Sequence, residues 1–323
     1  MSENNLIKKR IAMVGLGDIA QKAYLPIISQ HPLITPVLCS RNIDTLSLLA
    51  DKYRIAEVFD DYQMLLKSKP DAIMIHAATS AHYHLAKLAI EHNIAVYVDK
   101  PLSDNIQQVN LLIQLAEQHN VLIYVGFNRR YSPLVQEIKS SLSENMTVNK
   151  DITVQKNRFN LPAFAETFIF DDFIHVIDTV RYLDCESDFY PKHINVMAQF
   201  ESDLLANLQI SWQSQFSILN ANMNRIAGIN QERLLVTSKG SSWQVDNLNE
   251  GEVYQEQQFK RLSFNDWEQT LYKRGFVSLI EDWLEQLQVG LFNKRIAEDI
   301  LITHQICDQV LKQVNTLAKI NKA

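Results

Sequence analysis

The stretch Ile11-Ala12-Met13-Val14-Gly15-Leu16-Gly17-Asp18-Ile19-Ala20 decides the fold of the first part of this chain. An apolar run of strand length leads directly into two glycines, and a helical pattern begins behind them. Glycine is scarce, because the 323 residues include 8 where the usual frequency would give roughly twenty. Two glycines within three residues therefore indicate a backbone geometry that other residues do not adopt easily.

The residues around this stretch alternate short apolar runs with helical patterns. Continuous apolar runs predict strands that are buried on both faces, at 11–14, 34–39, 72–75, 94–98 and 121–125. Apolar residues at helical spacing predict helices at 19–29, 43–53, 82–91 and 105–118. This α/β alternation is typical of a Rossmann domain with a doubly wound parallel sheet. Pro26 interrupts the first helical pattern, so we expect a kink or a restart near Leu25.

The pattern changes after Gly126. Residues 206–213 alternate apolar and polar side chains, which predicts a strand with one polar face. Further strands are predicted at 152–159, 194–200, 233–237 and 252–259, and helices at 169–183, 276–289 and 297–318. We therefore predict two domains. Residues 1–126 form a Rossmann dinucleotide-binding domain, and residues 127–323 form an α+β domain for substrate binding and oligomerisation, with a large, mostly antiparallel open sheet.

Composition and charge exclude several classes of function. A net charge of -6 gives no basic surface for nucleic acid or for an anionic membrane, so neither partner is expected. The uncharged run 204–224 is rich in Asn, Gln and Ser and does not predict a membrane helix. Three widely spaced cysteines suit reduced thiols. Because residues 1–10 lack the apolar segment of a secretory signal, we expect a cytoplasmic protein. No Cys/His cluster or HExxH motif predicts a metal site.

The glycine turn matches the GxGxxA fingerprint of dinucleotide-binding proteins, and it has the context that this fingerprint requires, after a strand and before a helix. Gly15 permits the tight turn, Gly17 lets the backbone approach a pyrophosphate, and Ala20 allows the helix to pack closely on the strand. The intervening Asp18 and Ile19 open the helix, whose amides and positive dipole end favour phosphate. A plain strand-to-helix turn is the alternative.

The end of the second predicted strand bears on the choice of cofactor. In NAD-specific sites a carboxylate there binds the ribose 2′-hydroxyl. This chain instead has Ser40 and Arg41, a hydroxyl and a guanidinium that would not repel a 2′-phosphate. The pattern predicts a preference for NADP, with NAD as the alternative. A solvated Arg41, or one stacked on adenine, would serve NAD equally well.

Two further segments carry residues suited to acid–base chemistry. Lys100 follows the strand predicted at 94–98, at the edge where α/β sheets bind ligands, and can donate to a substrate oxygen. A surface lysine at a strand end is the alternative. In the helix predicted at 169–183, Asp171 lies one turn before His175, an arrangement that fixes the imidazole tautomer and raises its basicity. An exposed helix face with an incidental pair is the alternative there.

With these residues identified, the chain resembles the Gfo/Idh/MocA family of NAD(P)-dependent oxidoreductases along essentially its whole length, and within it the group labelled MviM. Four segments in the family's order carry the resemblance. They are the glycine box, the E-K-P box, the G-F-x-R-R-[FY] box and the D-x-x-x-H-x-x-D helix, at Val14 to Ala20, Val98 to Ser103, Val125 to Tyr131 and Asp171 to Asp178. The glycine box alone is weak evidence, whereas the four together are specific.

The resemblance implies roles for particular residues. Lys100, Asp171 and His175 stand where the inositol and sugar dehydrogenases have their catalytic lysine, aspartate and histidine. His82 matches a family histidine at the start of a helix, either as a cap or as a cofactor contact. The residues predicted to bind the cofactor are thus Gly15, Gly17, Asp18, Ile19, Ala20, Ser40, Arg41, Ala77, His82, Asp99 and Lys100.

Three departures from the family pattern concern the substrate more than the chemistry. Asp99 replaces a glutamate, Ala77 and Ala78 stand where Thr-Pro is usual near the nicotinamide, and Phe173 fills a frequent glycine position.

We therefore expect an oxidoreductase that transfers a hydride between a nicotinamide and a hydroxyl-bearing carbon of a polyol, sugar or sugar derivative. His175 is the expected general acid/base, Asp171 orients it, and Lys100 stabilises the reacting oxygen. Two alternatives are a NAD-retaining glycoside-cleaving relative and a cofactor-binding regulator without turnover. The weakly charged polar face of 206–213 further predicts self-association, as a homodimer or homotetramer.

Overall fold

The computed structural model describes residues 8–144, 146–185 and 189–320, and the chain divides into two compact units. The first unit is Met1–Gly126 with Ile280–Ala297, and the second is Phe127–Leu279 with Glu298–Ala323. The sequence predicts a single domain boundary, after residue 126, with residues 127–323 in the second domain. The structure differs in that residues 280–297 return to the first unit.

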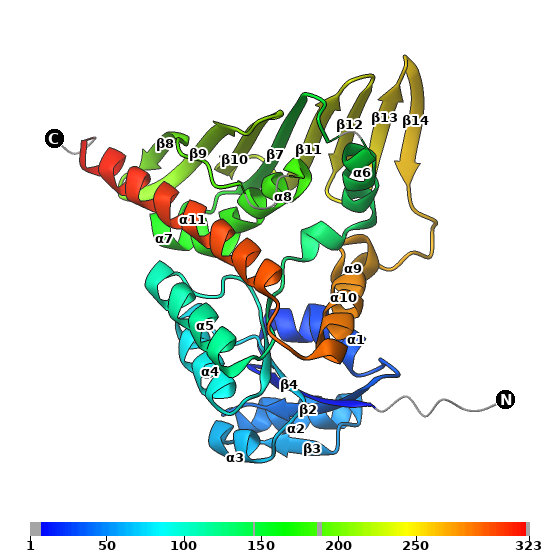
Figure 1. Cartoon of the computed structure of the whole chain (residues 1–323), viewed down its shortest axis with the longest axis vertical. Helices are drawn as coiled ribbons and strands as arrows, with labels where there is room; N and C mark the ends of the chain where they lie inside the picture. Colours follow the sequence, from blue (N-terminus) through cyan, green and yellow to red (C-terminus); the bar gives the residue numbers. More distant parts are fainter. Residues whose placement is uncertain (1–7, 145, 186–188, 321–323) are drawn as a thin grey trace. The chain divides into compact units, whose positions relative to one another are not determined.

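The first unit is built on a six-stranded parallel sheet in the order β3-β2-β1-β4-β5-β6 (Figure 1). The predicted doubly wound parallel sheet of a Rossmann fold is confirmed, and β3 adds a sixth strand to the five that were predicted. The order reverses between β1 and β4, and doubly wound sheets bind their ligands at such a switch point. Every residue of β4 and β5 is buried, which explains their continuous apolar sequences. The elements are β1 (Lys9–Val14), η1 (Ala20–Tyr24), α1 (Leu25–Ile28), β2 (Ile34–Cys39), α2 (Ile43–Tyr53), β3 (Glu57–Phe59), α3 (Tyr62–Lys67), β4 (Ala72–Ile75), α4 (Thr79–Glu91), β5 (Ala95–Val98), α5 (Ile106–His119) and β6 (Ile123–Val125).

The first helical segment changes its geometry before Pro26. η1 is a π-helical turn, and the α-helix α1 restarts at Leu25. Proline lacks the N–H that a continuous α-helix would use, and its ring crowds the preceding turn, so the restart predicted near Leu25 is confirmed. The π-turn also leaves Tyr24 fully buried.

Aromatic packing holds residues 280–297 to the first unit. Trp283 lies in α10 (Phe276–Val289), and its ring packs edge-on against Tyr97 at 5.2 Å between centroids. Tyr97 in turn stacks on Tyr124, whose hydroxyl donates to Asp282. A sequence pattern shows that α10 is amphipathic, but it does not identify the surface that receives its apolar face.

The second unit is built on an eight-stranded sheet in the order β14-β13-β12-β11-β7-β10-β9-β8. All neighbours are antiparallel except β7 and β10, which confirms the predicted large, mostly antiparallel sheet. The elements are η2 (Asn128–Tyr131), α6 (Pro133–Glu144), β7 (Lys150–Phe159), α7 (Ala165–Thr167), η3 (Phe168–Phe173), α8 (Ile174–Asp184), β8 (Asn195–Glu201), β9 (Leu204–Gln213), β10 (Ser217–Ala227), β11 (Gln231–Ser238), β12 (Ser241–Asp246), β13 (Glu250–Gln255), β14 (Gln258–Ser263), α9 (Thr270–Lys273) and α11 (Lys294–Ile320).

Two predictions for this unit are wrong in detail. The single strand predicted at 252–259 is a hairpin, because Glu256 and Gln257 adopt left-handed φ angles of 49° and 67° and turn the chain between β13 and β14. The single helix predicted at 169–183 is α-helical only from Ile174, and the π-helical η3 precedes it. In η3, Asp172 is buried while its neighbour Asp171 is exposed.

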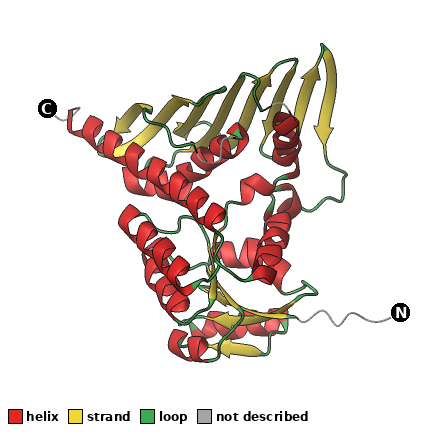
Figure 2. Cartoon of the chain, viewed as in Figure 1, coloured by secondary structure: helices red, strands yellow, loops and turns green. Residues whose placement is uncertain are grey.

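The helices of the second unit lie on one face of its sheet (Figure 2). This inner face carries the alternate apolar residues of each strand, and Leu208, Leu219, Ala221 and Leu234 are completely buried. α8 packs on β7 and β10. The strand period of two therefore separates a core face from an outer face, as the alternation in 206–213 predicts.

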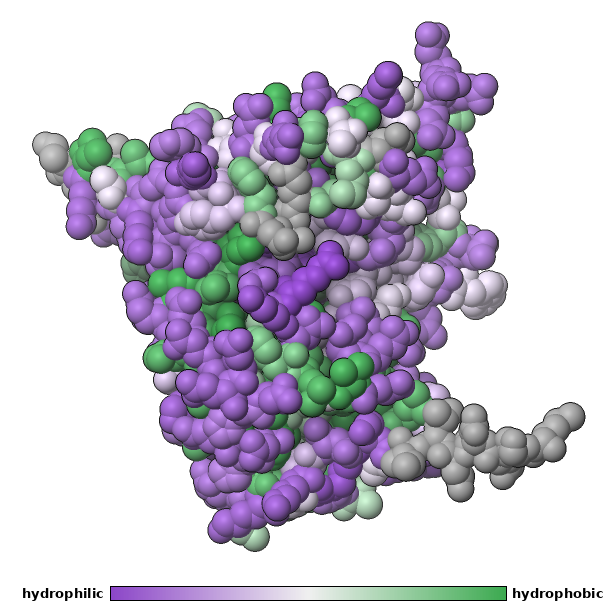
Figure 3. All heavy atoms as spheres, viewed as in Figure 1, coloured by the Kyte–Doolittle hydropathy of each residue, from purple (hydrophilic) through white to green (hydrophobic). Residues whose placement is uncertain are grey.

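The surface drawn in Figure 3 is mainly hydrophilic, and hydrophobic residues appear on it in small groups. Among the described residues, no helix combines the length and the apolar character needed to cross a bilayer. The three cysteines, Cys39, Cys185 and Cys307, are free.

Candidate active site

The turn after β1 requires glycine at its first position. Gly15 has a φ of +85°, and a Cβ there would lie 2.5 Å from the backbone nitrogen of Ala77 and 2.8 Å from the carbonyl carbon of His76. No side chain fits at that distance, so Gly15 lets the turns after β1 and β4 approach each other. A Cβ on Gly17 would meet nothing within 4 Å. Space beside Gly17 is what close approach of a pyrophosphate would need.

The start of the following helix also fits a dinucleotide. Ala20 is completely buried, which allows the helix to pack closely on the sheet. Asp18 and Ile19 are exposed, and Asp18 forms an ion pair with Lys22 at 2.8 Å. Backbone amides in the first turn of such a helix lack intrahelical partners and favour phosphate oxygens. The chemistry of this edge therefore suits a pyrophosphate.

The end of β2 has the residues that the sequence analysis weighed for the 2′ position. Arg41 is exposed, and Ser40 accepts a hydrogen bond from the Asn42 amide at 3.2 Å. The next strand adds acidic residues that the sequence analysis did not consider. Burial, together with the nearby carboxylates of Asp61 and Asp60, raises the pKa of Cys39 to about 11. The edge at β2 therefore carries both signs of charge.

His76 follows β4 and was not predicted as a site residue. Its side chain is buried, and neither ring nitrogen has a hydrogen-bond partner within the described part of the chain. Burial, with a smaller contribution from His82, lowers its pKa to about 3, so the ring is neutral at physiological pH. The sequence signal that could have identified His76 is a histidine directly after the apolar strand predicted at 72–75.

His82 connects the turns that follow β4 and β5. Its Nδ1 lies 2.7 Å from the carbonyl oxygen of Pro101, and its Nε2 lies 2.9 Å from that of Ala77. Both partners are acceptors, so the ring does not cap the backbone amides of α4. Among the predicted residues, the structure thus brings His82 together with Ala77, and the backbone of Ala77 lies beside Gly15.

Asp99 and Lys100 follow β5, and Asp99 lies beside a buried pair of tyrosines. Tyr24 and Tyr97 share a hydrogen bond of 2.8 Å between their hydroxyls, and the Tyr24 hydroxyl also donates to Asp99 at 3.4 Å. Burial raises the pKa of Asp99. The peptide bond from Lys100 to Pro101 is cis. Asp99 therefore faces the interior, while Lys100 is half-buried at the sheet edge.

Gly126 makes room for this tyrosine pair. A Cβ there would lie 2.3 Å from the Tyr97 hydroxyl oxygen and 2.8 Å from that of Tyr24. The glycine that opens the family's G-F-x-R-R-[FY] segment is thus required by packing.

The second unit contains the remaining predicted residues. Asp171 is exposed in η3, and His175 is half-buried in the first turn of α8. A π-helical turn lies between the two side chains, whereas the sequence analysis assumed one continuous α-helix. Phe173, which replaces a frequent glycine, is completely buried.

The second aspartate of the D-x-x-x-H-x-x-D segment serves a different purpose from the first. Asp178 is buried and accepts hydrogen bonds from Arg130, and Arg130 also bonds to Asp299 of α11. Two of the segments that the sequence resemblance identified are therefore joined by a buried ion pair. The sequence identified Asp178 only as the last residue of this segment, and its ion pair with Arg130 was not predicted.

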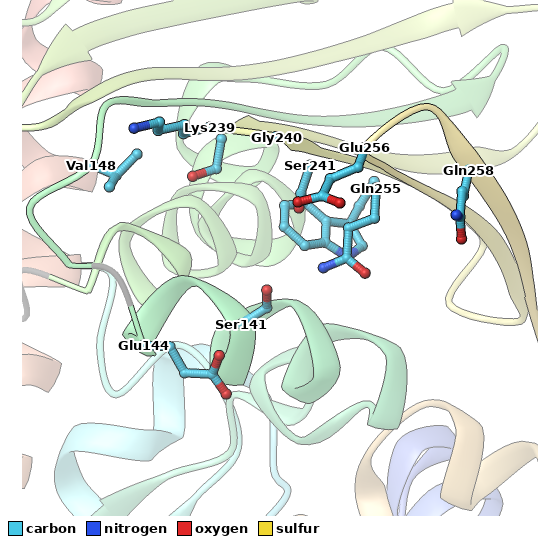
Figure 4. A pocket seen from close by; sticks show the side chains of 11 residues that line it. Ser141, Glu144, Val148, Lys239, Gly240, Ser241, Gln255, Glu256 and Gln258 are labelled. Carbon is cyan, nitrogen blue, oxygen red and sulfur yellow. The ribbon is translucent and has the colours of Figure 1, made fainter.

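A cavity of about 570 Å³ opens elsewhere in the second unit, between the end of α6 and the turns from β11 to β12 and from β13 to β14 (Figure 4). Its polar lining includes Ser141, Glu144, Lys239 and Glu256. None of the predicted site residues lines it. No group of three or more His, Cys, Asp or Glu within the described ranges is arranged to hold a metal ion.

Comparisons with known proteins give two family matches. Residues 9–127 match an oxidoreductase family with an NAD-binding Rossmann fold, and residues 133–256 match the YceM-like C-terminal domain. A solved structure of a Gfo/Idh/MocA family oxidoreductase from Vibrio cholerae is 37% identical, with a TM-score of 0.88, and covers 95% of this chain and 100% of that one. The MviM dehydrogenase structure from Clostridium difficile is 28% identical, with a TM-score of 0.86, and covers 94% of this chain and 99% of that one.

Curated relatives agree with these matches. YceM from Salmonella typhimurium is 27% identical over 302 residues, which is 93% of this chain and 96% of that protein. Two partial matches have names that state a substrate. D-glucoside 3-dehydrogenase from Escherichia coli is 23% identical over 54% of this chain and 53% of that protein. Myo-inositol 2-dehydrogenase from Thermotoga maritima is 25% identical over 44% of this chain and 42% of that protein.

Proposed function

Since the chain belongs to the Gfo/Idh/MocA family of oxidoreductases, we propose that it transfers a hydride between NADP and a hydroxyl-bearing carbon of a polyol, sugar or sugar derivative. The observation that carries the proposal is the glycine turn. Gly15 is required by its φ and by the backbone of Ala77, while space is left beside Gly17. Relatives named for D-glucoside and myo-inositol oxidation support the class of substrate.

The residues of this chain have separate tasks in that reaction. A bound nicotinamide supplies or accepts the hydride. His175 takes the hydroxyl proton in oxidation and returns it in reduction, and Asp171 orients the imidazole. Lys100 donates a hydrogen bond to the reacting oxygen and stabilises its negative charge. The cofactor-binding set predicted from the sequence holds the dinucleotide, with the pyrophosphate at the turn from Gly15 to Ala20.

Turnover tests the chemistry. A panel of polyols, sugars and sugar derivatives is assayed with each cofactor at the nicotinamide absorbance. Lys100→Met and His175→Ala are each expected to lower kcat by about a hundredfold or more, the usual scale for losing an oxyanion donor or acid–base help. Lys87→Met and His84→Ala, in α4, serve as matched controls. Near-full turnover by both site variants would place the reaction elsewhere.

Calorimetry tests the preference for NADP. A guanidinium contact to the 2′-phosphate is charge-assisted, so NADP should bind more tightly than NAD. The double variant Ser40→Asp with Arg41→Ala should reverse the preference, whereas Lys52→Ala at the far end of α2 should leave it unchanged. Asp60→Asn should tighten NADP binding by removing a nearby negative charge. Equal or tighter binding of NAD by the unmodified protein contradicts the assignment.

A further inference from the structure

Three cations meet one carboxylate on the inner face of the second unit. Arg158 donates from Nε and Nη2 to the two oxygens of Asp172, at 2.7 and 3.0 Å. Arg225 donates from Nη2 to the same carboxylate at 3.2 Å, and Lys156 forms an ion pair with it. We call these four residues the Asp172 cluster. Lys156 and Arg158 come from β7, Arg225 from β10 and Asp172 from η3.

Neighbouring charges do not balance the cluster. Arg129 is matched by Glu232, which accepts two of its hydrogen bonds at 2.5 and 2.9 Å. The exposed carboxylate of Asp171 interacts electrostatically with Arg225, and Arg274 interacts electrostatically with Glu232. With these four groups included, the cations still outnumber the carboxylates. Uncompensated charge is costly where water is excluded, so an added anion would stabilise the buried part of the cluster.

Most of the charged side chains of the cluster are buried. The side chains of Lys156, Arg225 and Asp172 are 5, 5 and 6% exposed. The neighbouring cations lower the pKa of Asp172 and keep it ionised. Burial and Arg129 lower the pKa of Lys156 to about 7, so the lysine is the cation that most readily loses its charge. A negative charge bound nearby would favour the protonated, positively charged form of Lys156.

Two donors of the cluster have no partner among the described residues. Nε of Arg225 is buried and makes no hydrogen bond. Nη1 of Arg158 also donates to none of the described residues, because the hydrogen bonds of this guanidinium leave from Nε and Nη2. Arg158 is 34% exposed and is therefore the member that a molecule from solvent can reach. A guanidinium edge of this kind suits a carboxylate or phosphate.

We propose that the Asp172 cluster binds an anionic group of the substrate, a carboxylate or a phosphate, through Arg158. The inference rests on the proposed function, since Asp172 lies three residues before His175 in the same helical segment. The preferred substrates are then sugar acids or sugar phosphates rather than neutral sugars. The protein thereby selects an acidic member of the polyol and sugar class.

Matched substrates test the inference. The value of kcat/KM is measured for neutral and anionic members of two series. Glucose is compared with gluconate, glucuronate and glucose 6-phosphate, and myo-inositol is compared with its monophosphate. One charge-assisted contact predicts a preference of about tenfold or more for the anionic member. Arg158→Gln should bring the anionic-to-neutral ratio close to one, and Arg158→Lys should keep part of it. Arg233→Gln, on the outer face of the same sheet, is the control. Preference for the acids or for the phosphates identifies the anion.

Binding without turnover separates this inference from the proposed function. Gluconate, glucuronate and inorganic phosphate should raise the Tm of the unmodified protein relative to chloride at equal ionic strength, and Arg158→Gln should abolish the shift. A shift without turnover upholds the anion site and counts against the proposed reaction. Turnover of neutral sugars without a shift in Tm overturns the anion site alone.

A further outcome concerns the cofactor. If Arg158→Gln weakens NADP binding, Arg158 binds a phosphate of the cofactor and the inference is wrong. Should Arg158→Gln fail to fold, the anionic-to-neutral ratio of kcat/KM and the shift in Tm are measured in Arg158→Lys, and an unchanged ratio and shift there count against the anion site.

Discussion

His76 occupies a position where a titratable group cannot easily take a charge. Its ring lies 4.1 Å from that of Tyr24, and its nitrogens find no hydrogen-bond partner among the described residues. The unfolded chain binds a proton near pH 6.5, whereas the folded protein does so only near pH 3. The unfolded state therefore holds more protons in this interval, and stability present above pH 6.5 is lost as the pH falls through it.

We expect His76→Leu to reduce the acid sensitivity of the first unit. The free energy of unfolding of the unmodified protein should fall with acidification by up to about 1.4 kcal/mol per pH unit from this group. Urea unfolding at pH 7, 6, 5 and 4 measures the slope, and the exposed His84→Gln is the control. A difference between His76→Leu and the unmodified protein that is constant over this range would show that His76 does not titrate on unfolding.

Ion pairs between helices connect the elements of the second unit. Arg130 in η2 contacts Asp178 in α8 and Asp299 in α11, and its guanidinium lies 5.1 Å from the centroid of the Phe127 ring. Burial penalises all three charges, and their mutual contacts offset that penalty. Removing the arginine would take this cation from the buried carboxylate of Asp178, while Asp299 keeps its ion pair with Arg181 at 3.1 Å.

Arg130→Met should therefore lower the free energy of unfolding by about 3–5 kcal/mol, the usual cost of breaking one side of a buried pair. Arg233→Met, which removes the more exposed partner of Asp246, should cost about 1 kcal/mol or less. Denaturant unfolding checks both values. Adding Asp178→Asn to Arg130→Met should restore part of the loss. Equal losses in the free energy of unfolding for the two arginine variants would show that the buried ion pair contributes no more to stability than the exposed one.

Element patterns were predictable where one physical signal dominates. The strands of the first unit are buried on both faces, so their apolar runs are unambiguous, and Pro26 fixes the helix restart. β3, with three residues, is too short for such a signal. In β10, apolar residues alternate with Asn220, Asn222 and Asn224, and asparagine usually favours turns. The β12–β13 turn places Asn247 and Leu248 in left-handed conformations, and although Asn247 suits that geometry, a leucine does not predict it.

The candidate site was predictable only where a motif carries it. The positions of Gly15 and Ala20 follow from backbone geometry that the fingerprint encodes. The Asp172 cluster combines three elements, with Arg225 53 residues from Asp172, and charged residues are normally expected at the surface. One local signal existed. In the strand predicted at 152–159, Lys156 and Arg158 continue the inward positions of Ile152 and Val154.

At the scale of the molecule, the outer face of the large sheet carries few charges along its three neighbouring strands β7, β9 and β10. Along β7, β9 and β10, which are described in full, the outward residues are hydroxyl, amide and apolar side chains, with Asp151 as the single charge. Ile218 is 52% exposed and Leu235, on β11, is 41% exposed. Weakly charged surfaces that include apolar side chains are easily desolvated and resemble protein interfaces.

We therefore predict that two copies of the chain pair through this outer face, and an isologous contact would give a dimer, with a tetramer if a second contact forms. Gln209 lies opposite Met197 and Asn222, so Gln209→Lys with Gln213→Lys would place like charges within the paired face and should shift the protein towards monomer. Light scattering at several protein concentrations measures the mass. Gln107→Lys with Gln118→Lys on α5 adds the same charge elsewhere. A monomeric unmodified protein at micromolar concentration refutes the pairing, and an oligomer unaffected by the sheet lysines assigns the contact to another surface.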